Sequence, residues 1–144
     1  IDPALLGELL KGFNDHYDDV KTPNDWIALD PNVVADHARD PFNNFQVPPN
    51  NQALYDFTRL WMDICHKEWA AKVPKKLPVY LIAGDQDPVG NFGEGIYQIT
   101  NWLIDAGRKV KTKVYSGYRH EIHNEPPIRD EVEAGIIGFF ADLI

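Results

Sequence analysis

Two strand-like runs on either side of one amphipathic helical pattern constrain this 144-residue chain most strongly. Leu77–Gly84 (LPVYLIAG) is almost continuously apolar, as expected of a strand buried in a parallel sheet. Val110–Gly117 (VKTKVYSG) alternates Val and Thr with Lys, which predicts a strand with one wetter face. Asn91–Ala106 places apolar residues at helical spacing, and Gly107 suits the position just past a helix end. The pattern predicts two parallel neighbouring strands joined by a right-handed crossover.

An acid and a histidine follow the two predicted strands. Asp87 lies in DQDPVG and His120 in YRHEIHNE, 33 positions apart. Loops that follow parallel strands emerge at the same edge of the sheet, so we expect these side chains to be close in space. An acid and then a histidine, each just past a strand, is typical of the second half of a Ser-His-Asp relay. The only serine, Ser116, has Val114 and Tyr118 where a G-x-S-x-G turn needs glycines, so the chain offers no convincing nucleophile.

Each candidate has a rival nearby. Asp85 competes with Asp87, and an Asp-Pro pair after a strand is also common in ordinary turns. His123 competes with His120, but His120 lies nearer the strand end. We favour Asp87 as the acid and His120 as the base, and we interpret His123 as a loop residue.

A metal site or a cysteine nucleophile is less well supported. His120, Glu121 and His123 lack the i, i+4 histidine spacing that lets two ligands share a helix face, and no third ligand is evident. Cys65 lies inside a predicted amphipathic helix, where a structural thiol is the simpler interpretation. Three further histidines have no matching groups around them in the sequence: His16, His37 and His66.

Composition narrows the class of protein. A formal net charge of −8 argues against nucleic-acid binding, which needs a basic surface. A single cysteine excludes an internal disulfide and suits a cytoplasmic location. No apolar run approaches the roughly 20 residues of a membrane span, and no basic leader opens the sequence. Because the chain begins at Ile1 and not at Met, we expect it to be part of something longer.

The chain divides near Pro74 into a helical part, residues 1–73, and an alternating strand-and-helix part, residues 74–144. Two strands and two helices cannot cover both faces of a parallel sheet, so we expect part of a larger α/β domain. The other expected elements are an irregular segment, Pro41–Asn51, and four helices: Pro3–Phe13, a helix from Asp30-Pro31 that ends before Pro41, Gln52 to about Ala71, and Ile128–Leu143.

The motifs resemble a known family. LPVYLIAGDQDPVG followed by VYSGYRHEIHNE is similar to the final portion of an α/β-hydrolase of the monoacylglycerol lipase, lysophospholipase and serine aminopeptidase-like group. The upstream DWIALDPNVVADHARDPFNNF resembles the helical cap of that group. The resemblance implies that residues 1–73 are a cap and residues 74–144 the C-terminal strands and helices of the hydrolase core. The fold class it implies is α/β, the C-terminal part of an α/β-hydrolase.

The resemblance also implies chemistry. Asp87 matches the catalytic acid and His120 the general base of a serine hydrolase that cleaves lipid-like or small acyl esters without a metal or organic cofactor. The nucleophile and oxyanion hole would lie upstream of residue 1, so we expect this chain alone to be inactive. The expected partners are an acyl ester or lipid-like substrate and, as a protein partner, either the missing N-terminal half or a second copy of the chain. Two alternatives stay open: a non-catalytic interaction module (half of a split hydrolase, or a pseudoenzyme) and a peptidase of the same fold.

Overall fold

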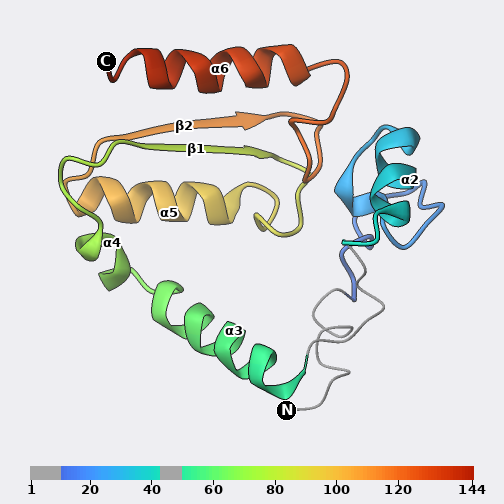
Figure 1. Ribbon diagram of the computed structural model, residues 1–144, viewed down its shortest axis with the longest axis horizontal. Helices are drawn as coiled ribbons and strands as arrows, with labels where there is room; N and C mark the ends of the chain where they lie inside the picture. The colour runs from blue at the N-terminus through green and yellow to red at the C-terminus, as the bar shows by residue number, and fades with distance from the viewer. Residues whose placement is uncertain (1–10, 43–49) are drawn as a thin grey trace.

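The computed structural model describes residues 11–42 and 50–144 (Figure 1). Among them, no helix is long and apolar enough to cross a membrane. The elements, in chain order, are the 3-10 helix η1 (Asp25–Ile27), the helices α2 (Pro31–Arg39), α3 (Asn51–Ile64) and α4 (Glu68–Lys72), strand β1 (Val79–Gly84), helix α5 (Glu94–Asp105), strand β2 (Val110–Tyr115) and helix α6 (Arg129–Ala141).

The predicted strand–helix–strand unit is present. Strands β1 and β2 pair in parallel, from Val79 opposite Val110 to Gly84 opposite Tyr115. Helix α5 packs against both strands on one side of the sheet, and α6 runs along the other side (Figure 1). Both strands point toward the same edge, so the loops that leave them are neighbours there. The layers agree with the expected α/β fold class.

Two clusters of buried apolar residues lie in the described part of the chain. One lies between β2 and α6, where Tyr115, Ile122, Ile128 and Val132 are buried together. The other, in the N-terminal part, consists of Trp26, Ile27, Ala28 and Val34, with Phe13 packed against it. Ile122 belongs to the loop after β2, so the first core anchors that loop directly to α6.

The helix opened by Asp30 and Pro31 forms as predicted. The Asp30 carboxylate accepts a hydrogen bond from the Asn32 backbone N–H, and the helix ends at Arg39, before Pro41. At the other end of the chain Gly107 adopts a φ of 71° after α5, where its N–H donates to the Ile104 carbonyl. The left-handed backbone there explains why a glycine follows the helix.

The predicted helix from Gln52 to about Ala71 is wrong in one respect, because it is two helices. It breaks at Cys65–Lys67, so Cys65 lies at the C-terminal end of α3, exposed, and not inside a helix. The buried Ala70 packs α4 against α5, and the Arg108 guanidinium donates to the carbonyls of Ala70 and Ala71. Tertiary contacts thus hold α4 on the core while α3 extends away from it (Figure 1).

Other boundaries also moved. Helix α5 begins at Glu94 and not at Asn91, because Asn91, Phe92 and Gly93 all have positive φ. Residues 3–10 of the expected helix Pro3–Phe13 lie outside the described residues, and its last residues form a turn with Gly12 at a φ of 89°. Most of the expected irregular segment Pro41–Asn51 also lies outside the described residues.

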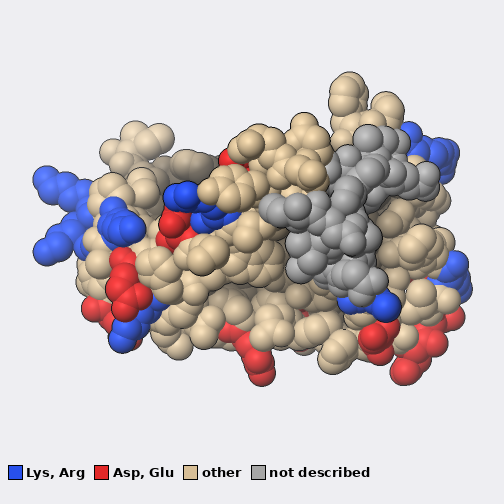
Figure 2. Space-filling view, turned by 90° about the horizontal axis from the view of Figure 1, so that it is seen from below, with Lys and Arg blue, Asp and Glu red and all other residues tan. Residues whose placement is uncertain are grey.

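Several large apolar side chains are exposed on α3. Figure 2 shows one face of the molecule, and between the two more highly charged ends of that face the described part is mostly uncharged. On α3 the exposed side chains are Tyr55, Phe57, Leu60, Trp61, Met62 and Ile64. So many exposed apolar side chains are unusual on a surface helix.

The loop that follows β2 lies tightly against Gly84 at the end of β1, and this contact generates a first prediction. A methyl group on Gly84 would lie 2.0 Å from the Tyr118 carbonyl oxygen and 2.4 Å from that of Arg119. Gly84→Ala should therefore reduce the free energy of unfolding by about 3 kcal/mol in urea denaturation. Gly138→Ala in α6, where nothing lies within 4 Å, is the matched control and should stabilise by roughly 0.5–1 kcal/mol. Equal effects of the two substitutions would contradict the inferred close approach.

Candidate active site

The two loops at the carboxyl edge of the sheet are joined through their backbones. The Asp85 N–H donates to the Tyr115 carbonyl at 3.0 Å, and the Gln86 N–H donates to the Tyr118 carbonyl at 2.9 Å. With no side chain, Gly84 lets the second loop lie directly against the end of β1. The residues that follow β1 and β2 are therefore fixed relative to each other before any side chain is considered.

Asp87 is buried and oriented by its surroundings. Its side chain is 8% exposed. One carboxylate oxygen accepts the Val89 N–H at 2.9 Å, and its backbone carbonyl accepts the Phe92 N–H at 2.8 Å. The other carboxylate oxygen lies 3.0 Å from Nδ1 of His120. The structure therefore brings together the two residues that the sequence favoured, as hydrogen-bond partners.

His120 is held on one side and open on the other. Its side chain is 38% exposed, and the Trp26 ring lies 5.2 Å from the imidazole, centroid to centroid. The hydrogen bond to Asp87 raises the pKa of His120 above its usual value, although burial acts in the opposite direction. Nearby Glu121 raises it further. With Nδ1 bonded to the acid, Nε2 is the ring nitrogen left for a substrate-side proton.

Asp85, the rival acid, has a different position. Its carboxylate accepts hydrogen bonds from Ser116 Oγ at 2.8 Å and from the Gly117 N–H at 2.6 Å. Burial raises the pKa of Asp85, but these hydrogen bonds outweigh burial and the net pKa is lowered. Asp85 thus acts as a tie between the two loops, and Ser116 is its donor.

The remaining candidates are spread apart. His123 is exposed in the loop, and among residues 11–42 and 50–144 no three His, Cys, Asp or Glu side chains are grouped to hold a metal ion. His66 lies 3.1 Å from Glu68, and His16 stacks on Phe92. His37 does have a charged neighbour, contrary to the expectation, since its Nδ1 lies 3.5 Å from a carboxylate oxygen of Glu121. No local sequence pattern marks that contact, because 84 positions separate the two residues.

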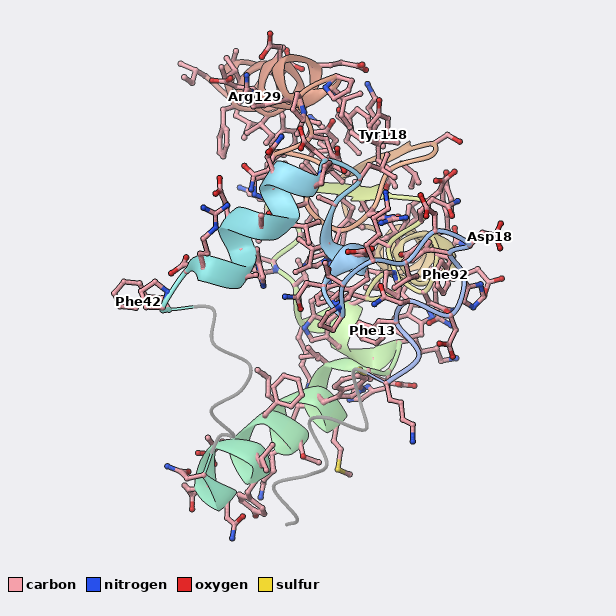
Figure 3. The ribbon with its side chains drawn as sticks, turned by 90° about the vertical axis from the view of Figure 1, so that its right-hand side faces the viewer. Phe13, Asp18, Phe42, Phe92, Tyr118 and Arg129 are labelled. Carbon is pink, nitrogen blue, oxygen red and sulfur yellow. The ribbon has the colours of Figure 1, made fainter. Side chains whose placement is uncertain are left out.

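The N-terminal segment is fastened to the histidine loop. The Glu121 N–H donates to the Ile27 carbonyl at 2.8 Å, and the Glu125 carboxylate, in a residue 1% exposed, accepts the Leu29 N–H. These bonds place Trp26 beside His120. Figure 3 shows this end of the molecule, with the segment from Phe13 to Asp18 lying near the loops that carry Phe92 and Tyr118.

Three residues that contribute to this region were not predicted from the sequence: Tyr17, Arg119 and Glu125. They are connected by hydrogen bonds to residues 69 to 96 positions away, and no local pattern marks such contacts. A weak signal exists only for Arg119, which directly precedes His120.

Comparison with known proteins adds a family context. A family model described as serine aminopeptidase, S33, matches residues 4–127. A highly thermostable carboxyl esterase from Bacillus coagulans, solved in complex with glycerol, is 56% identical with a TM-score of 0.93, over 98% of this chain and 46% of that one. A lipase in an open form is 35% identical with a TM-score of 0.85, over 94% of this chain and 44% of that one. A search of curated proteins gave no match. The chain thus spans less than half the length of either solved structure.

The acid–histidine hydrogen bond makes a pH-dependent prediction. Asp87→Asn should lower the pKa of His120, measured by NMR titration of the imidazole, because the wild-type value is raised mainly by that bond. Since the folded-state pKa is raised, the stabilisation from the pair is complete below about pH 6.5 and is lost as the pH rises through the folded-state pKa. The exposed Asp130→Asn is the control. An unchanged His120 pKa in Asp87→Asn would refute the pairing.

Proposed function

Because the chain belongs to the serine aminopeptidase (S33) family of α/β-hydrolases, we propose that it supplies the acid and the general base of a hydrolase that cleaves carboxylic esters. The observation that carries the proposal is the 3.0 Å hydrogen bond between buried Asp87 and His120, each just past one of two adjacent parallel strands. Both solved relatives are described as ester-cleaving enzymes, a carboxyl esterase and a lipase. Lysophospholipase-like and monoacylglycerol lipase-like acyl esters are the proposed substrates.

The proposed mechanism assigns one role to each residue. Nε2 of His120 accepts the proton of a serine hydroxyl as the serine oxygen bonds to the ester carbonyl carbon. It then donates that proton to the departing alcohol, and a water molecule hydrolyses the acyl-enzyme by the same route. Asp87 keeps the proton on Nδ1 and stabilises the imidazolium without being protonated itself. No cofactor is needed for these steps, and we propose a cytoplasmic location because this sequence carries a single cysteine.

The nucleophile is proposed to come from a segment outside this sequence. Ser116, the only serine, is exposed and donates its hydroxyl hydrogen to Asp85, at the end of β2 and not at the start of a helix. A nucleophile of this fold sits on a strand-to-helix turn beside backbone N–H groups that stabilise the oxyanion. We also propose that residues 1–73 form a cap and that residues 74–144 form the strands and helices of the core that carry the acid and the histidine.

A second candidate is a non-catalytic interaction module. It is favoured by the exposed apolar side chains of α3, among them Leu60, Trp61 and Met62, which would suit a protein partner. A peptidase of the same fold is the third candidate, since the matching family model is described as an aminopeptidase. The two experiments below separate these readings from the esterase.

The 144-residue chain by itself should not hydrolyse p-nitrophenyl acetate above the rate of free imidazole. It contains an acid and a base, but Ser116, its only serine, is hydrogen-bonded to Asp85 and not to His120. Steady-state assays of wild type, Cys65→Ala and His120→Ala check this. Turnover that survives Cys65→Ala and is abolished by His120→Ala would overturn the assignment of roles.

A hybrid enzyme tests the proposal directly. In the Bacillus coagulans carboxyl esterase, the part that aligns with this chain is replaced by this chain, which is 56% identical to it. The hybrid should hydrolyse p-nitrophenyl esters, and His120→Ala or Asp87→Ala should reduce kcat by roughly 10³-fold or more without a matching change in KM. His123→Ala is the matched control and should retain activity. A folded hybrid that binds but never turns over esters would favour the interaction module, and peptide cleavage without ester cleavage would favour the peptidase.

A further inference from the structure

Tyr17 fixes the peptide that precedes the acid. Its hydroxyl donates to the Gln86 carbonyl at 2.5 Å, across 69 positions of sequence. The N–H of the same Gln86 donates to the Tyr118 carbonyl at 2.9 Å. Gln86 is thus bonded from two sides, by the N-terminal segment and by the histidine loop. Since Asp87 is the next residue, its main chain has little freedom to move relative to either partner.

Arg119 fixes the main chain next to His120, as Tyr17 does next to Asp87. Its guanidinium lies over the Tyr17 ring, 4.0 Å from the ring centroid, and donates to the Asp25 carbonyl at 2.6 Å and to the Ala28 carbonyl at 3.3 Å. A planar guanidinium can stack on a ring and donate within its own plane at the same time, whereas a lysine ammonium cannot. Arg119 directly precedes His120, so these contacts fix the chain at the base.

Together the contacts form a closed cycle. It runs from Asp87 through Gln86 to Tyr17, from Tyr17 to Arg119, and along the chain to His120, which bonds back to Asp87. We propose that Tyr17 and Arg119 are positioning residues that hold the acid and the histidine at bonding distance by tying both loops to residues 17–28. The role in catalysis rests on the function proposed above, but the geometric role does not.

The electrostatics of Tyr17 fit positioning and not proton transfer. Burial raises its pKa, Arg119 lowers it and Asp87 raises it, with a net pKa of about 12. The hydroxyl therefore remains a hydrogen-bond donor throughout the pH range in which His120 titrates. The carboxylates that raise the pKa of His120 are Asp87 on the acid loop and Glu121 on its own loop.

Two conservative substitutions test this cycle of contacts, because each keeps the charge and most of the volume of the side chain. Tyr17→Phe removes one hydroxyl and leaves the ring for Arg119. Arg119→Lys keeps the positive charge but removes the planar guanidinium that stacks on the Tyr17 ring and donates to the two carbonyls. The matched controls are Tyr97→Phe and Arg39→Lys, both on exposed helical surfaces. Thermal unfolding of each variant identifies any that fails to fold, in which case the other variant decides.

Two readouts separate this proposal from the proposed function. The first is the His120 pKa, measured by NMR on the 144-residue chain, which needs no activity. It should fall in both variants, because a loosened Asp87–His120 bond no longer raises it. The second is ester hydrolysis by the hybrid enzyme, where kcat should fall on the order of tenfold with KM little changed and the acidic limb of the pH profile should move in parallel with the pKa.

The outcomes decide between the two ideas. If the wild-type hybrid is inactive but the His120 pKa falls in both variants, the proposed function fails and the positioning stands. If the hybrid is active and both variants match the controls in pKa, kcat and pH profile, the positioning proposal is overturned and the proposed function stands. A merely structural role for Tyr17 and Arg119 would lower the melting temperature and leave the pKa of His120 unchanged in the folded variants.

Discussion

The parallel register of β1 and β2 is the constraint on which the candidate site depends. Because Gly84 is opposite Tyr115, the chain leaves both strands at the same level of the sheet. The backbone bond from Gln86 to Tyr118 then carries that register into the loops. A slip of the register would shift Asp87 by one residue relative to His120 and reverse the faces on which side chains lie. The acid and histidine meet because the strands are aligned, and the side chains only complete the contact.

Local sequence patterns were enough to predict this register-dependent pair. Apolar runs, an amphipathic helix and Gly107 are all local features, and they fix a strand–helix–strand unit whose handedness and loop positions follow from general rules. The choice of Asp87 over Asp85 agrees with the geometry, in which only Asp87 bonds the histidine. His120 was favoured over His123 because it lies nearer the strand end, whereas Asp87 was matched to the catalytic acid through the family motif that GDQDPVG resembles.

The features that were missed all come from contacts across long stretches of chain. The break at Cys65–Lys67 follows from how Arg108 and the buried Ala70 hold α4, not from a helix-breaking residue. The Tyr17–Arg119 contact joins two segments whose own patterns are unremarkable. Short-range rules cannot find such contacts, because the free energy that favours them is gained only after the fold has brought the partners together.

The burial of the two strands is concentrated where the candidate site lies. Most of β1 and β2 is only partly buried, and full burial is reached at Ala83, Gly84 and Tyr115, the residues next to the acid and histidine loops. A parallel strand is normally covered on both faces along its whole length, so the amino-terminal ends of these strands call for more covering structure. The acid–histidine pair does not depend on that covering. Its hydrogen bonds, its ring contact with Trp26 and the tie to residues 17–28 all come from within this chain, so the pair is positioned here whatever completes the sheet.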